Sequence, residues 1–565
     1  MRSCFIVAPI LALALTATSP TRMNAQENKQ DATTRDDQNH DRHRGFEFWP
    51  GTLVLSRSVY EGNASSITIG ETLPLGCQGG STGLTVEVPT TTGGTTAVTV
   101  PCGMATDNGE YPNNFDTHNV WNNANSDGSF GVTSPIFLDN VTGDGEWLGT
   151  LPIPTDQMVT SFSSKSELAL NRSVDGRSIT FMGYRGGVGC GGSEVSPTSP
   201  NLLDVSASNT PGVCDPTNPV ISTFVSNPVV PAAYYRAVAE VDDDGNVSFT
   251  DGNAYSGDNG RAAIKGGDGL YYMVGNDNSG DLSKKQMSTT YDGIDLSNAT
   301  GAELLFPGLT PPTPPNIDMI GRLEFGTDKP GKDTNFRGLT IFNNTLYVSK
   351  GSGGNGINTV YQVGAAGTLP TGSATDLAAV PIAILPGFPN TAASTSIAFP
   401  FGIWFADANT LYVCDEGDGT LVTPPVNGNV ADAQSLATAG LQKYRLINGT
   451  WVLQYILQDG LNIGVPYGID HYPASIDPAT GGCRNIAGRH NYDGTVTIFA
   501  ITSTISANGD TGADPNKLVR VTDRVSDTTL PTGDWYLGHF RNVRSARAGE
   551  VLRGVALAPD DQDWW

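Results

Sequence analysis

Short apolar runs, each followed by a polar turn and a second apolar run, recur along most of the chain after residue 50. In NFRGLTIFNNTLYVSKG (335–351) the run 338–342 meets Asn343-Asn344, and a second run starts at Leu346. Two such runs around an Asn-rich turn are typical of a β-hairpin. Beyond a short helical piece expected near 430–439, no long stretch shows the 3.6-residue period of a helix, so the pattern predicts an all-β protein.

This hairpin phrase occurs six times. A copy often begins with arginine or an aromatic residue followed by glycine or alanine, and continues with an apolar strand, a polar turn and a second apolar strand. The copies lie at 167–186, 259–276, 335–351, 400–417, 466–503 and 551–561, where the fifth carries a long insert and the sixth is cut short. Further strand-like segments separate the copies, so each unit is expected to hold about four strands.

Four-stranded antiparallel units repeated around a ring form a β-propeller, because each sheet buries both faces only against its neighbours. Six copies predict six four-stranded blades; seven stays open if 200–260 or 500–550 holds another. The sixth copy lacks outer strands, which residues 51–59 and 134–153 can supply. We therefore expect one propeller domain over 46–565, closed by N-terminal strands that complete the last blade.

The order of several stretches resembles secreted, mostly bacterial β-propeller proteins of unassigned function, of the NHL-like or choice-of-anchor type. The stretches are GTLVLSRSV, IFLDNVTGDGEWLGTLPIPT, SELALNRSVDGRSITFMGY, YSGDNGRAA, FRGLTIFNNTLYVSKGSG, LQKYRLINGTWVLQ and LRGVALAP. The resemblance implies a propeller fold and export from the cell, and it implies no catalytic residue. Relative to this pattern, the cysteine-flanked loops near 77–102 and 190–214 look like insertions.

The N-terminal residues have the features of a secretory signal. Residues 1–25 combine a basic start, an apolar run from Phe5 to Leu15 and small residues before Gln26. The run is too short to span a bilayer comfortably, and no second long apolar segment follows. Residues 26–45 are polar and are expected to form a disordered arm. We expect a monomer without a membrane span, secreted to the extracellular space, the periplasm or the cell surface.

The chain is strongly acidic. Its 565 residues carry a formal net charge of −25, although only 16% of them are charged. Nucleic acids and anionic membranes bind clustered lysine and arginine, so the charge argues against both. The partners expected instead are an extracellular glycan, a peptide or an envelope protein.

Six cysteines remain when Cys4 of the signal segment is set aside. An even number in an oxidising compartment predicts three disulfides among fifteen formal pairings. The close pairs Cys77–Cys102 and Cys190–Cys214 would each close a loop, which would leave Cys414 and Cys483 for each other. No C-x-x-C motif is present, so a zinc site is the weaker interpretation.

Two sets of polar residues are candidates for a site in the central channel. Arginines fall at matching places in four copies and could hold an anion; they are Arg172, Arg261, Arg337 and Arg553. The alternative is that each guanidinium binds an acid or a carbonyl of the next blade. Oxygen donors suited to Ca²⁺ stand at the starts of four expected inner strands; they are Glu167, Asn259, Asn335 and Asp470. Their alternative role is turn chemistry.

Two functions follow from these residues. The first is a binding or structural module, because the catalytic motif H-E-x-x-H is absent from the sequence. The second is a propeller hydrolase of the lactonase or esterase type, in which a bound Ca²⁺ would polarise an ester carbonyl. No certain cofactor follows from the sequence, and the catalytic residues of such a hydrolase are unknown.

Overall fold

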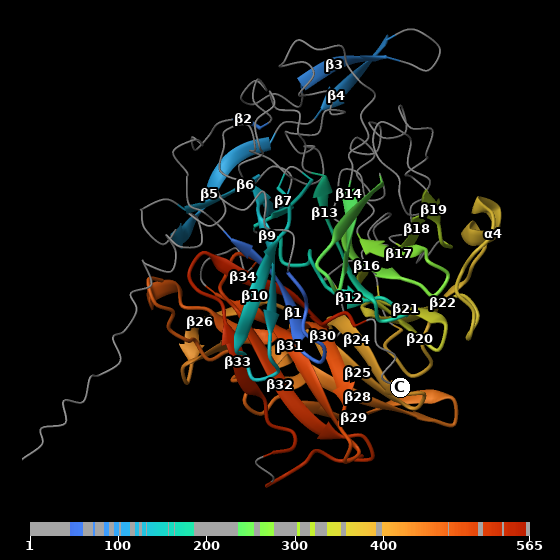
Figure 1. Cartoon of the computed structure of the whole chain (residues 1–565). Coiled ribbons are helices and arrows are strands. Elements are labelled where there is room, and N and C mark those ends of the chain that lie inside the picture. The colour runs from blue at the N-terminus through green and yellow to red at the C-terminus, as the bar shows by residue number, and fades with distance from the viewer. Residues whose placement is uncertain are drawn as a thin grey trace, which may run out of the picture. The chain divides into compact units, whose positions relative to one another are not determined.

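The computed structural model describes the greater part of the chain after residue 45. The described residues are 46–59, 72–73, 84–89, 95–100, 103–112, 119–123, 127–131, 133–155, 157–162, 164–185, 236–252, 260–275, 302–305, 317–321, 336–351, 357–390, 398–472, 474–506, 512–533 and 536–560. Strands dominate them, in a β-propeller-like arrangement (Figure 1). Within these ranges no helix is both long and apolar enough to cross a membrane.

Six sheets among the described residues are antiparallel and four-stranded, and five of them form the blades of the propeller-like arrangement. The first pairs β34 (Glu550–Leu557), β1 (Leu53–Val59), β9 (Ile136–Val141) and β10 (Trp147–Pro152). The second holds β16 (Gly260–Lys265), β17 (Tyr271–Gly275), β18 (Ala302–Leu305) and β19 (Ile317–Met319). The third holds β20 (Phe336–Phe342), β21 (Thr345–Lys350), β22 (Thr359–Val363) and β23 (Ile382–Ile384).

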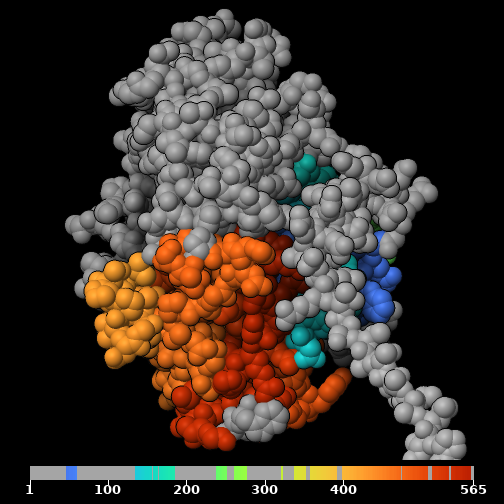
Figure 2. All heavy atoms as spheres, turned by 90° about the vertical axis from the view of Figure 1, so that its left-hand side faces the viewer, coloured from blue at the N-terminus to red at the C-terminus, as the bar shows by residue number. Residues whose placement is uncertain are grey.

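The last two blades complete this set. One holds β24 (Pro400–Asp407), β25 (Thr410–Asp415), β28 (Gly440–Ile447) and β29 (Thr450–Leu457). The other holds β30 (Ala479–His490), β31 (Thr495–Ile505), β32 (Lys517–Arg524) and β33 (Arg541–Ser545). Inner strands β24 and β30 contact each other, and the surfaces of these two blades adjoin in orange and red (Figure 2).

The predicted count of six or seven four-stranded blades is wrong, because the described residues form five. The segment expected to supply the remaining blade forms a six-stranded sheet. Its strands are β8 (Thr133–Ser134), β11 (Met158–Ser161), β12 (Asn171–Arg172), β13 (Ser178–Arg185), β14 (Arg236–Asp242) and β15 (Val247–Gly252). Two short strands pair with β13 along the same edge: β12 pairs with Ile179–Thr180, and β11 pairs with Tyr184–Arg185. The inner position of this sheet is therefore divided rather than filled by one long strand.

Smaller elements lie between the blade strands. They are β2 (Thr72–Leu73), β3 (Leu84–Pro89), β4 (Thr95–Val100), β5 (Gly103–Pro112), β6 (Asn119–Asn123), β7 (Asp127–Gly131), β26 (Leu421–Val426), β27 (Asn429–Ala431), α4 (Ala374–Ala378), α5 (Ala433–Thr438) and the 3₁₀ turn η6 (Ala474–Ile476). Helix α5 confirms the helical piece expected near 430–439. Its N-cap Asp432 accepts a hydrogen bond from the backbone N of Ser435 at 2.8 Å.

N-terminal and C-terminal strands share one blade, as the sequence predicts. Strand β1 lies between β34 and β9, so that Leu53 is opposite both Leu557 and Val141. The side chains of Leu53 and Leu55 are fully buried and belong to the apolar core that this blade forms with β30–β33. Strands from the two ends of the described chain therefore complete one another's hydrogen bonding and core.

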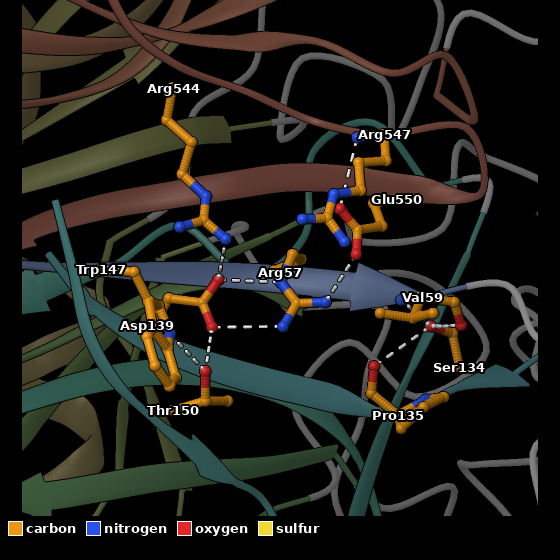
Figure 3. Close-up of polar contacts among 10 residues, drawn as sticks. All are labelled: Arg57, Val59, Ser134, Pro135, Asp139, Trp147, Thr150, Arg544, Arg547 and Glu550. Atoms are coloured by element: carbon orange, nitrogen blue, oxygen red, sulfur yellow. Dashed lines mark hydrogen bonds and ion pairs between the residues drawn. The ribbon is translucent and has the colours of Figure 1, made fainter. Parts of the chain in front are cut away.

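A buried ion-pair network holds β1 in this blade (Figure 3). Arg57 of β1 donates two hydrogen bonds to Asp139 of β9, at 2.8 and 3.2 Å, and a third to Glu550 of β34 at 3.1 Å. Arg544 of β33, in the adjacent blade, also donates to Asp139 at 3.2 Å. The side chain of Asp139 is fully buried, and Thr150 donates a further hydrogen bond to it. The Asp139 carboxylate on β9 thus connects β1 and β10 of the same blade with β33 of the adjacent blade.

The innermost strands approach one another closely at small residues. A Cβ atom added to Gly338 of β20 would collide with the carbonyl oxygen of Phe401 in β24, and one added to Gly402 with that of Arg484 in β30. One added to Gly554 of β34 would lie 2.5 Å from the carbonyl oxygen of Leu168, just before β12. Glycine is required at these positions because the backbone of the neighbouring blade occupies the space of a side chain.

Replacing Asp139 tests the closing network. The Asp139→Asn variant keeps the size of the side chain but removes the buried negative charge that Arg57 and Arg544 share, so we expect a loss of about 3–5 kcal/mol in the free energy of unfolding. Urea unfolding followed by circular dichroism measures it. The matched control is Asp144→Asn, which removes an exposed partner of Arg520 and should cost less than about 1 kcal/mol. Equal losses in the two variants would contradict the role assigned to Asp139.

Replacing Gly554 tests the close approach of the inner strands. Since Gly554→Ala places a Cβ atom against the backbone of residues 168–170, we expect it to destabilise the fold by about 1–3 kcal/mol. The control Gly267→Ala adds the same atom where its nearest neighbour is 3.7 Å away. Thermal unfolding of the two variants compares them directly. An unchanged melting temperature for Gly554→Ala would show that the strands can separate without cost.

Candidate functional site

Four buried arginines occupy equivalent positions in the innermost strands of four blades. They are Arg261 in β16, Arg337 in β20, Arg484 in β30 and Arg553 in β34. Each lies where the pairing with the next strand shifts register, which is a β-bulge. A bulge turns its extra residue out of the regular alternation of the strand, so a long side chain there can leave the sheet. In β24 the equivalent position holds the buried Phe401.

The guanidinium groups of these arginines bind protein oxygens. Arg261 donates to the carbonyl of Phe336 in the next blade at 2.8 Å and to the hydroxyl of Ser166 at 2.9 Å. Arg337 donates to the carbonyl of Gly351 at 3.0 Å. Arg553 donates to Ser58 and to two backbone carbonyls of the 157–164 segment, at Phe162 and Ser164. These contacts match the alternative in which the arginines join parts of the fold, and the proposed anion site stays a prediction.

Two of the repeat positions read from the sequence are displaced in the structure. Arg172 lies at the end of β12, four residues after Leu168, which occupies the position equivalent to the buried arginines. Gly468 lies in the loop before β30, and the inner strand carries Arg484 instead. The sequence reasoning missed Arg484 because Asn485 follows it where other copies have glycine or alanine. Comparison of CRNIAG with LRGVAL could have found it.

A buried carboxylate meets several of these cations. Arg484 donates to Glu416, which directly follows β25, at 3.0 Å, and both side chains are 6% exposed. Burial by itself raises the pKa of Glu416, but the nearby positive charges outweigh burial and lower the pKa to about 2. Those charges belong to Lys165, Arg337 and Arg484. Residues from three sheets and a connecting loop therefore converge on one anion.

The neighbouring carboxyl behaves in the opposite way. Burial raises the pKa of Asp415 to about 7, although backbone N atoms of Phe399 and Gly417 donate to it, each at 2.9 Å. Gln442 adds a third hydrogen bond at 3.0 Å. Adjacent carboxyl groups with separated pKa values are typical of acid–base sites. Here both groups are enclosed by protein contacts, and neither borders the cavity described below.

The predicted disulfide Cys414–Cys483 is present. It joins β25 to β30 over a sequence separation of 69 residues, with a Cα–Cα distance of 5.3 Å. Both cysteines are fully buried, and they directly precede Asp415 and Arg484. The bond therefore connects two blades beside the Arg484–Glu416 ion pair. The other predicted disulfide cysteines lie outside the described residues; they are Cys77, Cys102, Cys190 and Cys214.

The four predicted calcium ligands are not brought together by any described contact. Asn259 and Asn335 lie outside the described residues. Glu167 is buried, and its carboxylate accepts hydrogen bonds from Thr160, from the backbone N of Ser161 and from Tyr184. Asp470 is exposed in a turn. Within the part of the chain that the structure describes, no group of three or more His, Cys, Asp or Glu side chains could hold a metal ion. The calcium site remains a prediction.

A cavity of about 320 Å³ opens between the innermost strands. Its wall takes residues from β12 and from the inner strands of all five blades. Aliphatic side chains repeat around it, with one from each sector; they are Leu170, Ile264, Ile341, Ile403, Ile486 and Val555. None of the four buried arginines borders this space. In each of these strands the arginine at the bulge therefore binds protein oxygens, whereas residues that follow it in the strand line the cavity.

Aromatic side chains form one part of the cavity wall. Phe342 of β20 stacks on Phe405 of β24, with ring centroids 4.7 Å apart. The indole of Trp404 lies against Gly488 of β30 so closely that a Cβ atom on that glycine would overlap the ring. The side chain of Trp404 is partly exposed. The wall thus offers flat apolar surfaces on which a ring could pack.

The polar part of the wall comes from the turn after β12 and from residues near the end of the described chain. It includes Asn171, Arg172, Ser173, Asp175 and Asp560. Arg172 is half-buried, and its Nε atom donates to the carbonyl of Gly176 at 2.8 Å. Burial lowers the pKa of Arg172 from its usual value, and the charges of Asp560 and Asp175 oppose that shift. The cavity wall is thus more apolar than polar and has one charged edge.

Comparisons with known proteins add little to this description. No family model matches the chain, and no curated protein matches it. Among solved structures, a mutant of AofleA from Arthrobotrys oligospora is 10% identical, with a TM-score of 0.31 over 75% of this chain and 83% of that chain. A mutant of the Synechocystis apocarotenoid oxygenase is 9% identical, with a TM-score of 0.21 over 84% of this chain and 64% of that chain. Similarities this low carry no conclusion about function.

The lowered pKa of Glu416 predicts a specific acid sensitivity. Because the folded-state pKa is about 2 and the usual value is 4.5, Glu416 stabilises the fold above about pH 4.5, and this stabilisation is lost as the pH falls towards 2. The shift corresponds to about 3 kcal/mol. Unfolding free energies of the parent chain and of Glu416→Gln between pH 7 and pH 2.5 measure it.

The Gln variant should be less stable at pH 7 and should lose less stability on acidification than the parent chain. The control Glu47→Gln changes an exposed carboxyl and should follow the parent curve. Parallel curves for Glu416→Gln and the parent chain would contradict the assignment.

Proposed function

We propose that this chain is a secreted binding module that holds a small ligand in the cavity between its innermost strands. The supporting observation is the cavity itself, whose wall is mostly apolar and takes residues from every inner strand. Its volume of about 320 Å³ lies at the low end for small-molecule sites. Such sites are concave and apolar, with a few polar groups that orient the ligand.

The location of the cavity also favours a binding role. Its lining residues belong to strands whose backbones are fixed by neighbouring blades, so the wall is organised before a ligand arrives. A preformed site loses less conformational entropy on binding than one that must be ordered. The apolar part of the wall comes from strands, since Ile403, Trp404 and Phe405 all belong to β24.

Secretion forms part of this proposal. Residues 1–25 support it through their basic start and apolar run, and an oxidising compartment would maintain the Cys414–Cys483 bond. A relationship to the NHL-like or choice-of-anchor group of exported propellers would agree with the same location. Binding of a glycan, a peptide or an envelope protein to an outer surface remains a separate prediction. Such binding is compatible with a small ligand in the cavity.

The calcium-dependent hydrolase is not proposed here. No observation on the described residues favours it over binding, since Glu167 already accepts hydrogen bonds from three protein groups. The adjacent carboxyl groups of Asp415 and Glu416 do not border the cavity. A ligand in the cavity would therefore meet no described carboxyl group of that pair.

Filling the cavity tests the proposal. Thr340 of β20 borders the cavity and is only partly buried, so Thr340→Trp should occupy the space without unfolding the blade. We expect at least tenfold weaker binding of an apolar probe such as isopropenylnaphthalene, measured by equilibrium dialysis, because the indole replaces the ligand. The control Thr528→Trp places the same side chain in an exposed turn and should bind like the parent chain.

Two results would contradict the proposal. One is no binding of the hydrocarbon to the parent chain at its solubility limit. The other is unchanged binding in Thr340→Trp, with a melting temperature that shows the variant to be folded. The second result would place the probe elsewhere on the molecule.

A further inference from the structure

The charged edge of the cavity restricts the chemistry of its ligand, and the inference drawn from it rests on the binding function proposed above. Arg172 borders the cavity beside the apolar wall. Its guanidinium group carries five N–H donors in a planar fork. Only the Nε donor has a hydrogen-bond partner among the described residues, the carbonyl oxygen of Gly176. The two terminal nitrogens, Nη1 and Nη2, can therefore donate to a ligand.

The position of the guanidinium is fixed by the turn beneath it. Gly176 has a φ of +75°, and a Cβ atom there would lie 3.0 Å from Nη2 of Arg172. The guanidinium therefore lies directly over the glycine, where a larger residue would displace it. The turn also holds Asp175, whose carboxylate accepts from the hydroxyl of Ser173 at 2.5 Å and from the backbone N of Arg177 at 3.2 Å. Local hydrogen bonds thus set the geometry of this edge.

Charges of both signs meet at this edge of the cavity. Asp175 and Asp560 interact electrostatically with Arg172, and Asp175 also lies in the field of Lys265 and Arg177. Lys265 in turn pairs with Glu240 at 2.6 Å. Of these groups, Arg172, Asp175 and Asp560 border the cavity, so one cation and two carboxylates lie at its edge. A ligand anion would be repelled by the two aspartates and by the net charge of −25, while a ligand cation would be repelled by Arg172.

From this arrangement we propose that the cavity takes a neutral, largely apolar ligand that carries one carbonyl-type oxygen, and that Nη1 or Nη2 of Arg172 donates a hydrogen bond to that oxygen. The apolar body of the ligand packs on Phe342, Trp404 and Phe405. The carbonyl oxygen accepts a hydrogen bond from Arg172 and brings no net charge to this edge. A hydrogen bond from a charged donor is stronger than one between neutral groups, and stronger still where water is partly excluded.

Four naphthalene probes of similar shape test this ligand class by equilibrium dialysis against the full mature chain. Acetylnaphthalene carries a neutral carbonyl, isopropenylnaphthalene replaces the oxygen by carbon, naphthoate is an anion and naphthylmethylammonium is a cation. We expect acetylnaphthalene to bind about tenfold more tightly than the hydrocarbon, because only its oxygen accepts from Arg172. We expect both charged probes to bind more weakly than acetylnaphthalene.

The Arg172→Met variant keeps an unbranched apolar side chain and removes the donors. We expect it to lose the tenfold preference for acetylnaphthalene while binding the hydrocarbon as the parent chain does. Arg177→Met is the matched control, because it removes an exposed arginine of the same turn that does not border the cavity. It should keep the preference.

The outcomes separate this inference from the binding function on which it rests. If no probe binds the parent chain, the binding function itself fails. If the hydrocarbon and acetylnaphthalene bind equally well, the cavity binds ligands but Arg172 does not select a carbonyl, and the inference is overturned. Tightest binding of naphthoate or of the ammonium probe would overturn it as well, and would identify the preferred ligand as an anion or a cation.

Discussion

The arrangement of this protein depends on how closely the innermost strands approach one another. Between blades, the carbonyl oxygen of one inner strand occupies the space where the side chain of Gly338, Gly402 or Gly554 would otherwise lie. Only a residue without Cβ allows this contact. The blades therefore pack backbone against backbone at this position, and the residues on either side of it along each strand have separate roles.

Four of the innermost strands carry a buried arginine at the equivalent bulge position, and these arginines turn toward other parts of the fold. Arg261 and Arg553 reach carbonyl oxygens outside their own strands, and Arg484 reaches Glu416 beside the Cys414–Cys483 bond. The residues after the contact form the wall of the cavity. The same repeated stretch of each innermost strand thus supplies polar contacts between blades at one residue and the cavity wall at the residues after it. For this reason the four buried arginines do not border the cavity.

The sequence predicted the hairpins because a strand period and a polar turn are local signals, as in 335–351 and 400–417. It also predicted that β1 would join β34, because the last copy lacked outer strands. It could not predict that β11 and β12 would share one edge of β13, because strand pairing between segments that are distant in the sequence leaves no local signal. Arg172 was aligned with the wrong position for the same reason: spacing in the sequence does not reveal where a bulge shifts the register. No local sequence signal marks Trp404 and Ile486, and only the fold shows that they border one space.

Locating a bound molecule tests the account most directly. Crystals of the mature chain soaked with acetylnaphthalene would show where the probe binds and what its oxygen contacts. The account predicts electron density between the inner strands, with the rings against Phe342 and Trp404 and the oxygen within hydrogen-bond distance of Nη1 or Nη2 of Arg172. Density only on an outer surface, for example over the exposed side chains of Ile447, Val452 and Leu453, would contradict it.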